Sequence, residues 1–502
     1  MIRRPRRAQD LAEVVAQDDA RLDSRIMRGS AWVAVSYGGR NVVSLLTTLA
    51  LVRLLEPRAF GLVALAWTVL MVTDQVQNAG AAAALVYRRT DVERAAASAF
   101  LFVLCSGAVL FGVALLLAPL FASLFHTPEL TSVLRVMALL LITRAFGTIP
   151  LALLERNIDF RTRSVCELTG ALAQAGVSLG LAFSGFGVWS IVFGQIAGSA
   201  VQSGLAWAVA PLHPDPRKAS FGVIRGLVRY GRYVSATNIL NLANNTADNV
   251  VIGRVLGVTA LGFYAVAFRL ADFPNTVIAH IVGRVMFPVY SLLQNELARF
   301  RRAFIQNLQR IAVLALPVSV TIIVCAEPIV LGLFGEKWQE AVGPLRILAV
   351  YGLVKSFSSP GGEVFKGAGR PELGLMVGVL QIALIVPGLI VLVRSHGIEG
   401  AALAMLIAVT VCGAVKLWLA LRLLEGSLVE LGRALAPSIL CSALLGATLL
   451  LLIPATGSLG PAVQLAALVA AGTAVYAAAT MAFARSIVMP MWIGLRGADA
   501  TR

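Results

Sequence analysis

The sequence predicts an all-α polytopic membrane protein with about fourteen transmembrane helices, and three observations predict it. Hydrophobic residues make up 58% of the 502 residues and charged residues only 14%, whereas a soluble domain carries about 25% charged residues. Apolar segments long enough to cross a bilayer, about 20 residues each, recur along the whole chain. Basic residues gather in every second linker between those segments, as the positive-inside rule requires.

The apolar segments define the helices that we expect in the membrane. They are residues 31–52, 60–86, 96–120, 130–154, 164–184, 186–210, 233–256, 260–290, 304–334, 340–365, 372–394, 398–421, 432–454 and 461–484. The segments 60–86, 260–290 and 340–365 are the most interrupted by polar residues.

The distribution of Lys and Arg over the linkers tests this count. The odd-numbered linkers hold only Arg53, Arg58, Arg254, Lys337 and Arg394, and the even-numbered linkers and both tails hold the other linker cations. One miscounted span would invert every later linker. The alternation therefore predicts fourteen spans with the N- and C-termini in the cytoplasm, and it explains the net charge of +16 without nucleic acid.

The remaining polar segments are a leader and one longer linker. Residues 1–29 are basic and amphipathic, and we expect them to lie on anionic lipid at the cytoplasmic face. Residues 211–232 combine a proline-rich turn with a basic amphipathic stretch, which predicts a linker on the same surface.

An internal repeat divides the chain into two halves. Residues 52–66 align with residues 253–267 at one fixed offset, so that Arg53 matches Arg254 and Gly61 matches Gly262. We expect two pseudo-symmetric six-helix lobes, 30–210 and 233–424, around a central cavity. Residues 425–502 would add a C-terminal helix pair and a cytoplasmic tail. The alternative is a chance alignment of apolar segments, which composition bias favours.

The span at 233–256 carries polar residues on one helical face: Asn238, Asn241, Asn245, Asp248 and Asn249. An unpaired polar group in hydrocarbon costs several kcal/mol, so this face must meet a partner helix or a water-filled cavity. The repeat places Arg40, Ser44 and Thr48 opposite Asn241, Asn245 and Asn249, which predicts a second polar face in the first span.

Ionisable residues inside spans supply the candidate site, because they usually face the interior of a helix bundle. Arginine forks match phosphate oxygens, and asparagine both donates to and accepts from hydroxyls. The predicted substrate-binding residues are Arg40, Ser44, Asn78, Asn241, Asn245, Asn249, Arg269, Arg284 and Lys355. Asp74 and Asp248 are candidates to carry a coupling H⁺ or Na⁺. The alternative is that these charges form structural ion pairs between helices.

Other chemistry has no support in the sequence. The five cysteines lie in apolar runs without metal-ligand spacing, and the four histidines form no cluster. The glycine-rich stretch at 361–370 lacks the order of a phosphate-binding loop. We expect no catalytic residue, no metal and no cofactor beyond a coupling ion.

Several motifs resemble those of a known family. They are Arg53-Leu-Leu, Phe60-Gly61-Leu, Arg144-Ala-Phe-Gly-Thr-Ile-Pro150, Asn245-Thr-Ala-Asp248-Asn249 and Leu261-Gly262-Phe-Tyr264, with similar stretches at 84–89 and 154–160. Over about residues 25–430 the chain resembles the polysaccharide and O-antigen exporters (Wzx-like flippases) of the multidrug/oligosaccharidyl-lipid/polysaccharide superfamily, closest to the lipopolysaccharide and exopolysaccharide biosynthesis branch. The resemblance implies two six-helix lobes around a central cavity, plus one more helix pair.

The resemblance implies a function and a location. It implies a flippase that moves undecaprenyl-diphosphate-linked oligosaccharide across the bacterial inner membrane by alternating access, without enzymatic chemistry. Membrane lipids and the polysaccharide polymerase or export machinery are the partners that it implies.

Three alternatives remain open at this point. A lipid II flippase would move a similar ligand. A drug/cation antiporter of the same superfamily would need an acidic cavity lined by aromatic residues, and aromatics are 7% of this chain. A membrane polymerase or ligase would need a sizeable exoplasmic loop, and the odd-numbered linkers are all short.

Overall fold

A computed structural model describes residues 38–78, 85, 91–157, 159–210, 212–279, 286, 289–290, 292–294 and 296–483, with the backbone alone at 74–78, 216, 226–239, 241 and 277–279. These residues form helices, and no strand occurs among them. The predicted leader at 1–29 lies outside the described residues.

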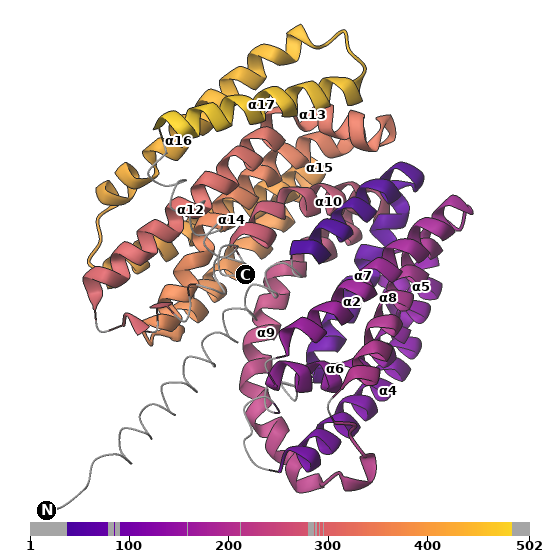
Figure 1. Ribbon diagram of the computed structural model, residues 1–502. Coiled ribbons are helices and arrows are strands. Elements are labelled where there is room, and N and C mark those ends of the chain that lie inside the picture. The colour runs from indigo at the N-terminus through magenta and orange to yellow at the C-terminus, as the bar shows by residue number, and fades with distance from the viewer. Residues whose placement is uncertain are drawn as a thin grey trace, which may run out of the picture.

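The first lobe contains the helices drawn from indigo to magenta in Figure 1. They are residues 38–54, α2 (Pro57–Asn78), α4 (Val92–Leu124), α5 (Glu129–Met137), α6 (Leu139–Arg156), α7 (Phe160–Phe183) and α8 (Val188–Val209). Ala138, between α5 and α6, keeps helical backbone angles, so the two helices together cover the expected span at 130–154.

The second lobe begins after a short 3₁₀ turn, η1 (Pro216–Lys218). Its elements are α9 (Phe221–Val255), α10 (Val258–Ala271), η2 (Pro274–Ala279), α12 (Leu297–Val324), α13 (Ala326–Ile329), η3 (Val330–Phe334), η4 (Glu336–Ala341), α14 (Val342–Gly367) and α15 (Pro371–Leu423). The appended pair is α16 (Leu428–Ala455) and α17 (Pro461–Phe483), drawn in yellow at the edge of this lobe.

Two helix boundaries in the structure differ from those that the apolar segments predict. The amphipathic stretch from 221 onward is continuous with the following span, and both belong to α9. The two spans expected at 372–394 and 398–421 both lie in α15, which breaks at His396 and Gly397. Gly397 has a φ of 59°, a left-handed conformation that glycine adopts without a steric penalty.

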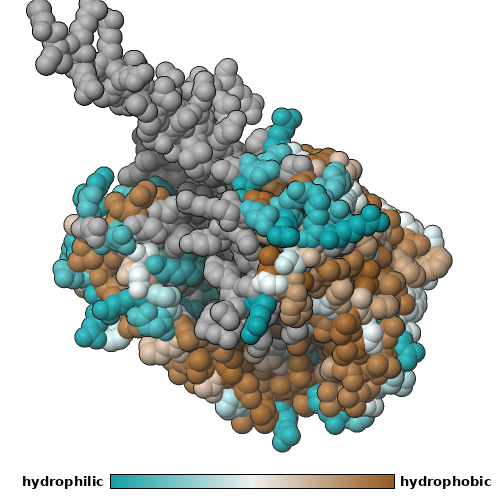
Figure 2. Space-filling model, turned by 90° about the horizontal axis from the view of Figure 1, so that it is seen from below, coloured by the Kyte–Doolittle hydropathy of each residue, from teal (hydrophilic) through white to brown (hydrophobic). Residues whose placement is uncertain are grey.

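Seven helices in the described part of the chain are long and apolar enough to cross a membrane by length and composition: α4, the α5–α6 unit, α7, α12, α15, α16 and α17. Apolar stretches in α2 and α10 are shorter. The helical elements as a whole are consistent with fourteen spans. Figure 2 shows broad hydrophobic areas on the flanks of the molecule, as lipid contact requires.

The two lobes meet where the first turns of α2 and α10 cross, and the contact is reciprocal. A Cβ added to Gly61 would lie 1.8 Å from the carbonyl oxygen of Val258, and a Cβ added to Gly262 would lie 1.9 Å from that of Pro57. Pro57 and Val258 are related by the same repeat offset as the two glycines. A pseudo-two-fold axis therefore passes through this crossing, and the internal repeat is a property of the fold rather than a chance alignment.

Repeat-related arginines extend this interlobe seam. Arg53 Nε donates to the carbonyl oxygen of Leu333 in the second lobe, at 2.9 Å. In the opposite direction, Arg254 Nη1 donates to the carbonyl oxygen of Leu124 in the first lobe. The indole of Trp338 donates to the carbonyl oxygen of Val52 at 2.9 Å. The lobes are thus tied together at the end of the molecule that carries these residues.

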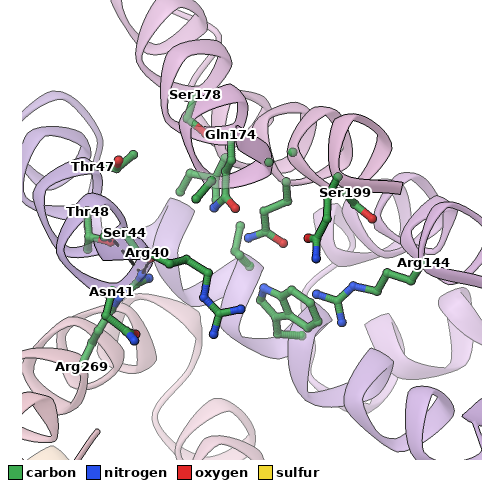
Figure 3. A pocket seen from close by; sticks show the side chains of 18 of the residues that line it. Arg40, Asn41, Ser44, Thr47, Thr48, Arg144, Gln174, Ser178, Ser199 and Arg269 are labelled. Atoms are coloured by element: carbon green, nitrogen blue, oxygen red, sulfur yellow. Dashed lines mark hydrogen bonds between the residues drawn. The ribbon is translucent and has the colours of Figure 1, made fainter. Parts of the chain in front are cut away.

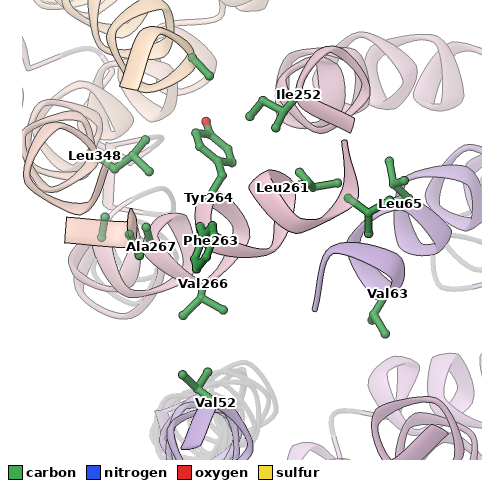
Figure 4. Close-up of a cluster of buried hydrophobic side chains, with 14 of the residues drawn as sticks. Val52, Val63, Leu65, Ile252, Leu261, Phe263, Tyr264, Val266, Ala267 and Leu348 are labelled. Atoms are coloured by element: carbon green, nitrogen blue, oxygen red, sulfur yellow. The ribbon is translucent and has the colours of Figure 1, made fainter. Parts of the chain in front are cut away.

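Apolar packing fills the space around the seam. One buried cluster joins both lobes and includes Val52 and Leu65 from the first and Leu261, Phe263 and Leu348 from the second (Figure 4). Because the helices lie in lipid and not in water, these contacts stabilise the interface by close van der Waals packing.

Candidate functional site

A cavity of about 1120 Å³ lies mainly in the first lobe and reaches the lobe interface. Residues 38–54, α2, α6, α7 and α8 line most of it, and α9 and α10 of the second lobe close one side. Its polar lining residues are Arg40, Asn41, Ser44, Thr47, Thr48, Arg144, Thr148, Glu167, Gln174, Ser178, Gln195, Ser199, Gln202, Ser203, Asn245 and Arg269. The cavity can therefore hold a ligand with many polar groups.

Three arginines reach this cavity from three different helices. Arg40 and Arg144 point toward its middle from opposite sides (Figure 3), and Arg144 lies 4.6 Å from the ring centre of Trp67. Arg269 belongs to α10, and its Nη2 donates to the hydroxyl and, at 3.4 Å, to the carbonyl oxygen of Ser44. This bond crosses the lobe interface, so Arg269 is held by the helix that also carries Arg40.

One carboxylate, Glu167, is among the lining residues, and basic side chains surround it. Arg163 Nε donates to Glu167 at 3.0 Å, and Arg40 Nη1 lies 3.9 Å from the same carboxylate. The charged residues of the lining are therefore three arginines and one glutamate that is already paired.

The structure brings together four of the residues predicted to bind substrate: Arg40, Ser44, Asn245 and Arg269 all line the cavity. Ser44 and Asn245 are related by the repeat and line the cavity from the two lobes. Asn249 instead donates to the hydroxyl of Thr68 at 3.3 Å and ties α9 to α2. The side chains of Asn78, Asn241, Arg284 and Asp74 lie outside the described residues.

Lys355 lies in the second lobe and is not among the lining residues of the large cavity. Its ammonium group is 3.2 Å from the carboxylate of Asp272. Thr276 donates to that carboxylate at 2.8 Å. A smaller cavity of about 250 Å³ is lined by Asp272 and shares Ser44 and Arg269 with the larger one. Lys355 thus forms an interhelical ion pair with Asp272, and its role in substrate binding stays a prediction.

Asp248 is buried in the second lobe, with 2% of its surface exposed. The hydroxyl of Tyr264 donates to its carboxylate at 2.8 Å, and the backbone N–H of Asn249 donates to it at 2.8 Å. It does not line the cavity. Asn245 on the same helix does line the cavity, and Asn249 bridges to α2. Asp248 therefore has a different environment from both.

Sequence reasoning missed Arg144 and the glutamines of α7 and α8 as site residues. Arg144 carries a signal, because it is an arginine inside a span. The glutamines also carry one, since Gln195, Ser199 and Gln202 recur at helical spacing on one face of α8. Among the residues that the structure describes, no three His, Cys, Asp or Glu side chains are grouped as a metal site would require.

Comparisons with known proteins agree on one family. A family model described as "Polysaccharide biosynthesis protein" matches residues 50–343. The succinoglycan biosynthesis transport protein ExoT of Rhizobium meliloti (strain 1021) is 30% identical over 65% of this chain and 66% of its own length. The lipopolysaccharide biosynthesis protein WzxC of Escherichia coli (strain K12) is 22% identical over 77% of this chain and 79% of its own.

Among solved structures, the fold is similar to that of the lipid II flippase MurJ in an inward closed conformation. The TM-score is 0.73 at 14% sequence identity, and the match covers 92% of this chain and 100% of that one. At this identity the likeness establishes the two-lobe helical fold.

Proposed function

The chain belongs to the polysaccharide biosynthesis protein family, and from this premise we propose that it is a transporter that flips polyprenyl-diphosphate-linked oligosaccharides across a membrane for cell-surface polysaccharide biosynthesis. The observation that carries the proposal is the cavity that holds Arg40, Arg144 and Arg269 together with a polar lining. The arginines neutralise the diphosphate, because a guanidinium forks onto two phosphate oxygens. The cavity volume accommodates the sugars.

Undecaprenyl diphosphate in a bacterial inner membrane is the carrier that we propose, with both termini in the cytoplasm. The positive-inside pattern supports this orientation, because it puts the linkers that contain Arg53 and Arg254 outside. The interlobe seam then closes the outer end, and the cavity is loaded from the cytoplasmic side. Alternating access follows if the lobes rock about the cavity and the seam parts.

A gene deletion tests this function. We expect lipid-linked oligosaccharide to accumulate on the cytoplasmic face of the membrane in cells that lack the chain. In intact spheroplasts, this oligosaccharide should be protected from a membrane-impermeant reagent that oxidises sugars. Units that reach the outer face but remain unpolymerised would instead indicate a polymerase or ligase and contradict the proposal.

The same carrier chemistry keeps a lipid II flippase as the second candidate, supported by the shared fold. Complementation separates the two: rescue of surface polysaccharide without rescue of peptidoglycan synthesis supports the first candidate. A drug/cation antiporter is disfavoured, because the three arginines repel a cationic drug and the one glutamate of the lining is already paired with arginine.

We propose that Asp248 carries the coupling H⁺ or Na⁺. Its support is a carboxylate buried apart from the substrate cavity and held by two hydrogen bonds. Asp248→Asn should leave folded protein in the membrane and lower the export rate, because an amide cannot take up a proton or bind Na⁺ in place of the carboxylate. The residual export should no longer respond to a proton uncoupler or to removal of Na⁺.

Tyr264→Phe is the matched control, since it removes one hydrogen bond and leaves the carboxylate in place. It should retain the response to the uncoupler or to Na⁺. Normal, gradient-dependent export by Asp248→Asn would assign the carboxylate a purely structural role.

A further inference from the structure

On the first-lobe side of the cavity, α8 and the part of α7 from Gly170 onward form an uncharged wall, beyond the paired Glu167. Gln174 and Ser178 lie one turn apart on α7, and Gln195, Ser199 and Gln202 follow one face of α8. Figure 3 shows Gln174, Ser178 and Ser199 on the helices that border the space into which Arg40 and Arg144 point. The cavity therefore has amide and hydroxyl groups on one side and guanidinium groups on others.

Backbone packing fixes the position of this wall. A Cβ added to Gly170 would lie 2.9 Å from the carbonyl oxygen of Gly198 and 2.8 Å from Cβ of Gln202. A Cβ added to Gly198 would lie 2.7 Å from the carbonyl oxygen of Gly170 and 2.7 Å from Cβ of Gln174. The two helices touch through their glycines, and Gln174 and Gln202 flank the contact. The close backbone contact between the two helices therefore fixes the Cβ positions of Gln174 and Gln202.

An unsatisfied polar atom within the wall indicates a missing partner. Gln195 Oε1 is buried and accepts no hydrogen bond from the described residues. A buried acceptor without a donor costs about 1–3 kcal/mol, so such atoms in native proteins generally have a ligand, water or functional partner. Gln195 lines the cavity, so a rotation of its side-chain amide would bring the unpaired Oε1 to a hydroxyl or amide donor of a bound ligand.

The chemistry of the wall differs from that of the arginines. A glutamine amide donates two hydrogen bonds and accepts others, which matches sugar hydroxyls and acetamido groups that also donate and accept. A phosphate only accepts, and it is bound more strongly by guanidinium groups. The two kinds of surface in one cavity can therefore divide one ligand into a charged part and an uncharged part.

We propose that Gln174, Gln195 and Gln202 form the subsite for the neutral sugars of the cargo, separate from the arginines that hold its diphosphate. The subsite rests on the proposed function and adds specificity to it. A site built to hydrogen-bond hydroxyls discriminates against ligands that lack them, because its own polar groups are then left unpaired.

The test compares two lipids bound to full-length protein in nanodiscs. One probe is undecaprenyl diphosphate without sugar, and the other is the lipid-linked oligosaccharide extracted from source cells that lack this gene. Gln174→Met with Gln202→Met keeps side-chain length and removes two amides. We expect this double variant to weaken binding of the glycosylated lipid by roughly tenfold or more, since each neutral hydrogen bond is worth about a factor of five. Binding of the bare lipid should not change.

Two further variants make the result specific. Gln306→Met replaces an exposed glutamine on α12 outside the cavity and should bind both lipids normally. Arg269→Ala should weaken both lipids alike. If the double variant does not fold, as judged by thermal unfolding, Gln195→Met takes its place with the same expected selectivity.

Equal losses for both lipids, or no loss for either, would overturn the sugar subsite while leaving the flippase proposal intact. Failure of the unmodified protein to bind either lipid would overturn the subsite and the proposed function together.

Discussion

Arg269→Ala should reduce export of the lipid-linked oligosaccharide by roughly ten- to a hundredfold while the protein remains folded in the membrane. Arg269 lines the cavity from α10 and bonds to Ser44 across the lobe interface. Alanine removes a charge-assisted contact to the diphosphate, which is worth about 1.5–3 kcal/mol. The measurement is the amount of surface polysaccharide in a deletion strain that expresses the variant at a matched level.

Two substitutions control for charge and for position. Arg269→Lys keeps the charge but cannot fork onto two oxygens, so it should restore only part of the export. Arg302→Ala removes an exposed arginine on α12 whose Nε donates to the carbonyl oxygen of Ala298 in the same helix; it should export normally. Full export by Arg269→Ala would show that this arginine serves the lobe interface and not the ligand.

Gly61→Ala should lower both the thermal stability and the export activity of the protein, and so should Gly262→Ala. In either variant the new Cβ would lie less than 2 Å from a carbonyl oxygen of the other lobe, at Val258 or Pro57. The backbones must separate, and overpacking of this kind costs about 1–3 kcal/mol. Thermal unfolding of purified protein and export in cells measure the two effects.

Gly112→Ala is the control, for which we expect no loss of stability. Gly112 lies inside α4, and a Cβ there meets nothing within 4 Å. Alanine in a helix is favoured over glycine by about 0.5–1 kcal/mol, so this variant should be as stable as the parent or more stable. The double variant at 61 and 262 should be less damaged than the two single effects added, because both substitutions open the same seam. A Gly61→Ala variant as stable as Gly112→Ala would contradict the reciprocal contact.

The asymmetry of the cavity has a consequence for the transport cycle. Most lining residues belong to the first lobe, whereas the buried Asp248 and the half-buried Asp272 belong to the second. If Asp248 carries the coupling ion, as we propose, ligand binding and ion coupling are divided between the lobes. Arg269 and Asn245, which line the cavity from the second lobe, would then be the contacts between that lobe and the ligand. Movement at the interlobe seam can connect the two events.

Much of the candidate site could be predicted because of the membrane itself. Arg40, Ser44, Asn245 and Arg269 stand out as polar residues in apolar spans, and lipid forces such residues inward. The same reasoning also selected Lys355, but a lysine inside a span can equally contact a ligand or form an ion pair, and the sequence does not distinguish these two cases. The partner, Asp272, is far away in the sequence and becomes a neighbour only when α14 packs beside the end of α10.

The glutamines of α7 and α8 illustrate the opposite case. Single uncharged amides among small residues carry little hydropathy signal, so a search for buried charge passes over them. Their alignment depends on the close approach of Gly170 and Gly198, which only the packed helices reveal. Asp248 was predicted as part of a polar face, and the turn of α9 directs it away from the cavity toward Tyr264.

The helical membrane fold follows from the sequence alone, because hydrocarbon excludes unpaired polar groups and loop charge alternates from span to span. The internal repeat predicts the two lobes, and the family is a matter of motif resemblance. Which polar side chains share the cavity, and which pair with one another, depends on the tertiary structure. Helix crossing angles and backbone contacts between glycines set those distances, and neither can be read from the spacing of residues along a single helix.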